Sequence, residues 1–117
     1  MSKIELIKPE RVDDKIINEI IRRIVAAVNP LKIVLFGSWA YGKPKGGSDI
    51  DILVMVEKSD LPKHKRAVKV YEALTGILIP KDIVVYTPQE IEEWSEVPQA
   101  FITTIVTKGK VVYEKKD

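Results

Sequence analysis

Alternating side chains in the segment from Asp49 to Glu57 constrain the fold of this chain more than any other feature of its sequence. The even-numbered positions carry only branched aliphatic residues, namely Ile50, Ile52, Val54 and Val56. The opposite face begins with two acids, Asp49 and Asp51, and continues with apolar residues. Because side chains alternate across an extended chain, the pattern predicts a strand with one face in the core and an acidic start on the other.

The rest of the chain reads as alternating helices and strands. The apolar run from Leu31 to Phe36, bounded by Pro30 and Gly37, predicts a central strand covered on both faces. Apolar spacing predicts helices over 11–29, 62–75, 87–94 and 97–107, and Thr87 and Glu90 have the spacing of a capping box at the start of the third. Further strands are expected over 77–86, strongest over 83–86, and over 110–114 as a final edge strand. This order predicts an α+β fold, an α/β sandwich built on a single small mixed β-sheet.

Composition limits both the size and the chemistry of the protein. The 117 residues predict a single domain spanning 1–117. A hydrophobic content of 45% and a net charge of +2 exclude a disordered chain and a uniformly basic nucleic-acid coat. There is no cysteine and one histidine, so catalysis would use carboxylates, hydroxyls and lysines. No apolar run is long enough to span a bilayer and residues 1–8 lack a signal-peptide pattern, so a cytoplasmic location is expected.

The two acids at the start of the aliphatic strand are the strongest chemical signal. Asp49 and Asp51 point to the same face, about 7 Å apart along the strand, where their charges repel. A divalent cation such as Mg²⁺ would relieve this repulsion, because it prefers carboxylate and phosphate oxygens. Asp82, at the start of the next convincing strand, is the candidate third carboxylate of a site for two metal ions. A solvated strand end is the simpler explanation for any one of these acids alone.

A glycine-rich segment precedes the acids. Gly37 would allow a phosphate to approach the backbone closely, and Ser38 follows directly where the strand ends. The segment is not a Walker P-loop, because Lys43 is followed by Pro44, and no G-x-G-x-x-G motif is present.

The sequence Gly37-Ser38, a short stretch to Gly42, then Ser48-Asp49-Ile50-Asp51 resembles the signature of the DNA polymerase β-like nucleotidyltransferase superfamily. The chain looks most like its minimal, single-domain MNT branch. This resemblance implies transfer of AMP from ATP with release of pyrophosphate, assisted by Mg²⁺. By match to the motif, Gly37, Ser38, Gly47 and Ser48 would bind the nucleotide. Asp49, Asp51 and Asp82 would ligate metal, and Asp82 would also act as general base.

The resemblance also implies a protein partner. Minimal members are commonly paired with a HEPN-domain toxin, which they silence as antitoxins by adenylylating a tyrosine. Two alternatives stay open, namely a non-catalytic nucleotide- or toxin-binding module and a small-molecule transferase of the aminoglycoside type. Membrane and nucleic-acid partners are not expected, and a homo- or hetero-oligomer stays open.

Two aromatic sites add further expectations. Relatives often carry an arginine between the motif's serine and glycine, where this chain has Trp39 and Tyr41. These two residues could pack on the sheet or contact the nucleotide or a partner. Trp94, with Phe101, Ile102 and Ile105, is expected to lie in the core rather than on a partner surface.

Overall fold

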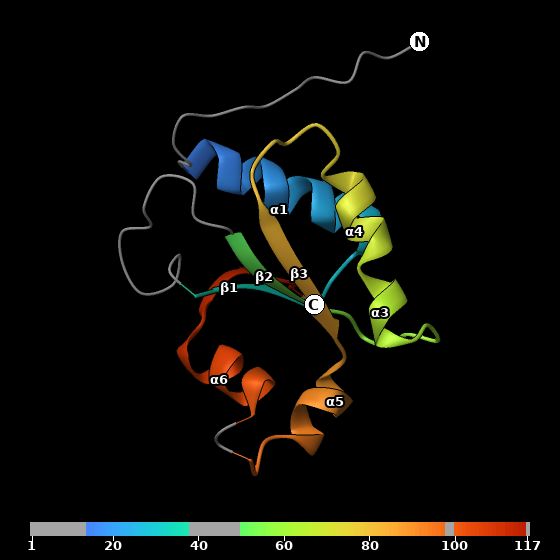
Figure 1. Ribbon diagram of the computed structural model, residues 1–117, viewed down its shortest axis with the longest axis vertical. Helices are drawn as coiled ribbons and strands as arrows, with labels where there is room; N and C mark the ends of the chain where they lie inside the picture. The colour runs from blue at the N-terminus through green and yellow to red at the C-terminus, as the bar shows by residue number, and fades with distance from the viewer. Residues whose placement is uncertain (1–13, 38–49, 98–99, 117) are drawn as a thin grey trace.

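A computed structural model of the protein describes residues 14–37, 50–97 and 100–116 (Figure 1). The helices are α1 (Asp14–Val28), α3 (Lys63–Arg66), α4 (Val68–Ala73), α5 (Pro88–Glu93) and α6 (Phe101–Lys108). The strands are β1 (Lys32–Phe36), β2 (Ile50–Met55), β3 (Lys81–Tyr86) and β4 (Lys110–Glu114). Within these residues no helix is long and apolar enough to cross a membrane.

The strands form one mixed sheet in the order β3-β2-β1-β4. β1 pairs antiparallel with both β2 and β4, whereas β2 and β3 run parallel. β1 is therefore a central strand and β4 an edge strand, as the sequence predicted. The predicted α+β fold with a small mixed sheet is confirmed.

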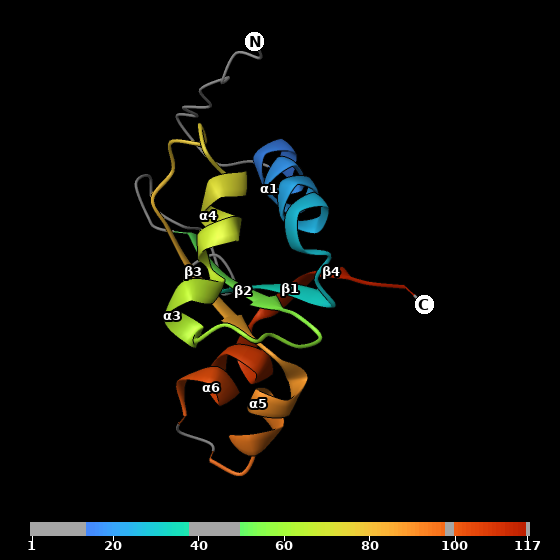
Figure 2. The same ribbon diagram turned by 90° about the vertical axis from the view of Figure 1, so that its right-hand side faces the viewer.

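The sheet separates two apolar cores, and Figure 2 shows it lying between α1 and α4 on one side and α5 and α6 on the other. On the first side, Ile52 of β2 packs with Ile24 of α1 and Val70 of α4, and all three are fully buried. On the second side, Leu53 packs with Ile102 and other residues of a smaller cluster. The alternation predicted for β2 thus places its even-numbered aliphatic residues against α1 and α4.

Two expectations from the sequence need correction. The helix expected over 62–75 breaks at Ala67, where ψ is −11°, and forms the separate helices α3 and α4. The break lets Arg66 face α5 while Val70 turns into the core. Trp94 is not a core residue, because it lies at the end of α5 and the residue is 44% exposed. Ile102, by contrast, is buried as expected.

A partly buried ion pair connects α3 to the start of α5. Thr87 and Glu90 form the predicted capping box, in which each side chain bonds the other's backbone N–H. The Arg66 guanidinium donates to Glu90 Oε1 at 2.6 Å and to Leu61 O at 2.9 Å. The Arg66 hydrogen bond is the main reason why the pKa of Glu90 is lowered to about 2.

Replacing Glu90 should reduce the acid sensitivity of the fold. Because the pKa of Glu90 lies below its unfolded value, its stabilisation is complete above about pH 4.5 and is lost as the pH falls toward 2. Glu90→Gln should lower the free energy of unfolding by about 1 to 3 kcal/mol at pH 7 and by much less at pH 2. Urea denaturation at both pH values measures the difference.

Glu19→Gln provides the matched control. The pKa of Glu19 is also lowered to about 2, mainly by a hydrogen bond from Arg22. Arg23 also donates to Glu19, and the Arg22 and Arg23 side chains are 67% and 22% exposed against 10% for Arg66, so solvent screens the charge of Glu19 more strongly. An equal or larger change in acid sensitivity for Glu19→Gln would contradict the importance given to the Arg66–Glu90 pair.

Candidate active site

Two of the three predicted acids lie side by side on the sheet. The parallel register of β2 and β3 pairs Asp51 directly with Asp82. Neighbouring strands are about 4.8 Å apart, so the two carboxylates start from adjacent positions. Ile52 and Ile83, the residues that follow the two acids, both pack on the α1 side of the sheet. Successive side chains of a strand point to opposite faces. Both acids therefore face the side of the sheet covered by α5 and α6.

The two acids differ in their access to solvent. Asp51 is half-buried, whereas Asp82 is exposed. Further along the same face, the strands bury Leu53 and partly bury Val84 against α6. Apolar packing therefore fills one end of this face, and the acids occupy the other end.

Gly37 brings the end of β1 against the Asp51 carboxylate. Phe36, the last residue of β1, pairs with Asp51, so Gly37 lies just beyond the pair. Gly37 has φ of +69°, and a Cβ at this position would overlap Asp51 Oδ2. Both the backbone conformation and the close approach require glycine here. The predicted role of Gly37 as a point of close approach thus has a geometric basis, although the group it meets is a carboxylate.

The remaining motif residues lie outside the described part of the chain. These are Ser38, Gly47, Ser48 and Asp49, together with Trp39 and Tyr41. Within the described residues no group of three acids, histidines or cysteines could hold a metal ion. The two described acids nevertheless fit a divalent cation, because adjacent carboxylates repel each other and offer the hard oxygen atoms that Mg²⁺ prefers.

The start of β3, which carries Asp82, is held by contacts that the sequence analysis did not anticipate. Ile50 donates its N–H to Pro80 O at 2.9 Å, and Lys81 Nζ donates to Ile77 O at 3.0 Å. On the outer edge of β3, the N–H of Ile83 donates to the Tyr71 hydroxyl at 3.0 Å. Helical spacing predicts a helix over 62–75, which includes Tyr71, but it does not indicate a contact between Tyr71 and β3.

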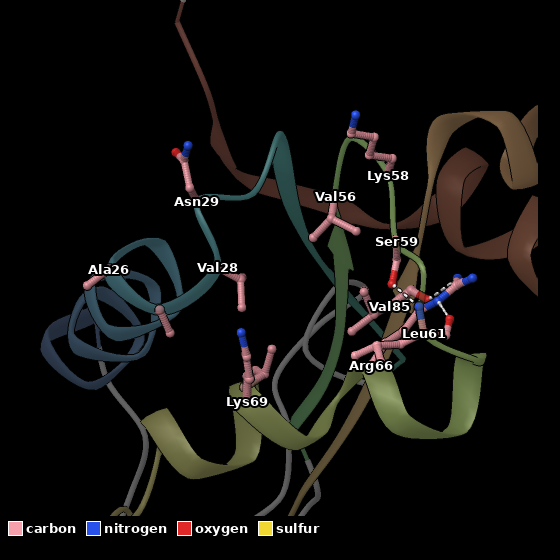
Figure 3. Close-up of a pocket in the computed structure, with 12 residues that line it drawn as sticks. Ala26, Val28, Asn29, Val56, Lys58, Ser59, Leu61, Arg66, Lys69 and Val85 are labelled. Atoms are coloured by element: carbon pink, nitrogen blue, oxygen red, sulfur yellow. Dashed lines mark hydrogen bonds between the residues drawn. The ribbon is translucent and has the colours of Figure 1, made fainter.

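A cavity of about 400 Å³ opens at the opposite end of β2 and β3, on the α1 side of the sheet (Figure 3). Apolar side chains such as Val56 and Val85 line it, together with the cations Lys58, Arg66 and Lys69. These cations do not converge on one point. Lys69 points toward Val28, whereas Lys58 points away from the cavity. Arg66 donates hydrogen bonds to Leu61 and Glu90. A binding pocket needs polar groups aimed at one point, so the paired acids remain the better candidate site.

Comparisons with known proteins concern the family and the fold of the chain. Residues 15–117 match the family model described as polymerase beta, nucleotidyltransferase. The fold is similar to the crystal structure of a Sulfolobus solfataricus protein provisionally described as a nucleotidyltransferase, with a TM-score of 0.62 and 21% sequence identity. That similarity covers 86% of this chain and 79% of the other. No curated protein sequence matches this chain at a significant level.

Gly37→Ala should disturb Asp51 as well as the stability of the fold. An alanine in the left-handed region costs about 1 to 2 kcal/mol, and its methyl group would also displace the Asp51 carboxylate. The amide resonances of Asp51 and Ile52 should therefore shift, in addition to a lower unfolding midpoint in urea.

Gly76→Ala is the control, because Gly76 also has a positive φ, of +94°, but lies outside the acidic site. It should lower the stability without shifting the Asp51 resonance. If both variants leave Asp51 unchanged, the close approach of Gly37 does not position that carboxylate.

Proposed function

Because the chain belongs to the polymerase beta nucleotidyltransferase family, we propose that it transfers AMP from ATP to an acceptor hydroxyl. Nucleotidyltransferases of this family generally use a nucleoside triphosphate and a divalent metal ion. The single observation that supports this function best is the register that pairs Asp51 with Asp82 beside Gly37. The motif adds Asp49 as a third metal ligand and Ser38, Gly47 and Ser48 as nucleotide-binding residues.

The two described acids suit different parts of the reaction. Asp51 is half-buried and confined by Gly37, so it suits a fixed metal ligand. Asp82 is exposed, so an acceptor hydroxyl can reach it from solvent. A divalent cation held by Asp49, Asp51 and Asp82 would neutralise charge on the triphosphate.

Asp82 would act as the general base in the transfer itself. The acceptor oxygen attacks the α-phosphorus, and its proton passes to the Asp82 carboxylate. The bond between the α-phosphorus and the bridging oxygen breaks, and the electron pair leaves with pyrophosphate. Backbone groups at Gly37 and Ser38 would orient the phosphates for in-line attack.

The proposed acceptor is a tyrosine of a HEPN-domain toxin, which the protein would silence as an antitoxin. This part of the proposal rests on the resemblance to minimal nucleotidyltransferases. Exposed apolar side chains on the α5 and α6 side, among them Trp94 and Val106, offer contact area to such a partner.

Replacing either acid should abolish transfer. With Mg²⁺, labelled ATP and the HEPN-domain product of a neighbouring gene, we expect label on a partner tyrosine. Asp51→Asn and Asp82→Asn should each reduce the rate at least about 100-fold, because each removes a ligand and Asp82→Asn also removes the base. Peptide mass spectrometry identifies the modified residue.

Asp60→Asn is the control, because Asp60 is an exposed acid in the segment that follows β2, at the far end from the pair. It should retain full activity, and all three variants should unfold at a similar urea concentration. Equal label transfer in the Asp51 and control variants would contradict the catalytic assignment. Label on an aminoglycoside but not on protein would replace the proposed acceptor, and inhibition of the toxin without ATP would favour a non-catalytic binding module.

A further inference from the structure

The outer edge of β3 directs backbone groups away from the sheet at the site of Asp82. β3 is the terminal strand in the order β3-β2-β1-β4, so only β2 pairs with it. Ile50 N–H bonds Pro80 O at one end of the parallel ladder, and Val56 N–H bonds Tyr86 O at the other. Backbone N–H and C=O groups point to alternate sides of a strand from one residue to the next. Because Pro80 and Tyr86 bond β2, the backbone groups of the even-numbered residues of β3, including Asp82, point toward β2. Ile83, the next residue, directs its N–H outward.

Tyr71 of α4 satisfies this outward N–H. Its hydroxyl oxygen accepts the Ile83 N–H at 3.0 Å. The Tyr71 residue is 42% exposed, so filling the core does not explain a large aromatic side chain at this position. The hydroxyl is the part of the side chain with a specific partner in the structure.

The helix that carries Tyr71 is a rigid support. Its neighbours Val70 and Leu74 are 0% and 1% exposed and belong to the main core with α1. Arg23 of α1 also donates to Thr75 O at 3.0 Å, just beyond the end of α4. The position of the Tyr71 hydroxyl is therefore set by α1 and α4, independently of the acidic face.

We propose that Tyr71 is a positioning residue for the metal and acceptor site, acting through the backbone of Ile83 on Asp82. The backbone of Asp82 pairs with β2 on one side, and Tyr71 accepts from the N–H of the next residue on the other. Held from both sides, Asp82 keeps its carboxylate beside that of Asp51, the residue with which it pairs in the sheet. The proposal rests on the function proposed above for Asp82.

A structural alternative is that the Tyr71 hydroxyl only occupies the outward N–H of Ile83, so that no other chain can pair with the edge of β3. On the same edge, Arg66 Nη1 lies 3.5 Å from Val85 O, so α3 also covers this side. The experiment must therefore separate sealing of the edge from positioning of Asp82.

Tyr71→Phe removes only the hydroxyl, and Tyr113→Phe is the matched control. Tyr113 lies on β4 and packs against the main core, distant in the sheet from β3.

In an amide hydrogen-exchange experiment, the Ile83 N–H should exchange about fivefold faster in Tyr71→Phe, the factor expected for the loss of one hydrogen bond. In a Mg²⁺ titration followed by the Asp82 amide resonance, the midpoint should rise several-fold in this variant. Its kcat should fall about tenfold with the KM for ATP within twofold, and Tyr113→Phe should match the wild type in every readout.

The exchange and Mg²⁺ readouts remain informative without turnover. If the wild type transfers no nucleotide, the proposed function fails, while a raised Mg²⁺ midpoint in Tyr71→Phe still supports positioning. Faster exchange at Ile83 with an unchanged Mg²⁺ midpoint would overturn the proposal and leave Tyr71 as an edge seal. An equal change in Tyr113→Phe, or a much lower urea midpoint in Tyr71→Phe alone, would also overturn it.

Discussion

The parallel pairing of β2 with β3 is the constraint on which the rest of this structure depends. Register in a sheet is specified by which side chains must be buried, and a slip of one residue would move every side chain to the opposite face. Here the buried residues Ile52 and Ile83 are partners in the register, and the same register pairs Asp51 with Asp82. One register thus produces both the apolar core and the acidic site. Burial of the aliphatic side chains stabilises this register and so holds the two like charges close together.

The two-sided arrangement of the sheet explains how a short chain supports such a site. The larger core, between the sheet and helices α1 and α4, provides most of the buried apolar side chains. The smaller core under α6 covers one end of the other face and leaves the strand starts for the acids. Support for the acids comes from the neighbouring strands and from the opposite face: Gly37 confines Asp51, and Tyr71 contacts the backbone beside Asp82. Most of the chain therefore serves as a scaffold for the two acids.

Sequence patterns predicted the parts of this structure that depend on local spacing. The strand alternation around Asp51, the capping box at Thr87 and the mixed sheet all follow from periodicity or from local side-chain chemistry. Contacts between distant segments could not be predicted in this way. The break at Ala67 accompanies an ion pair between Arg66 and a residue 24 positions further on. Trp94 is exposed rather than buried, and it lies where α5 ends. The Tyr71 contact spans 12 residues and involves a backbone group, which leaves no trace in composition.

Paramagnetic broadening by Mn²⁺ tests the central claim most directly, namely that the paired acids at the start of β2 and β3 form a divalent cation site. Amide resonances would be followed while Mn²⁺ is added at substoichiometric amounts, with Mg²⁺ added afterwards as competitor. The structure predicts that Asp51 and Asp82 broaden first, that Met55 and Tyr86 at the far end of the strands persist, and that Mg²⁺ restores the signals. Broadening centred on the far end, or no selective broadening at Asp51 and Asp82, would contradict the account.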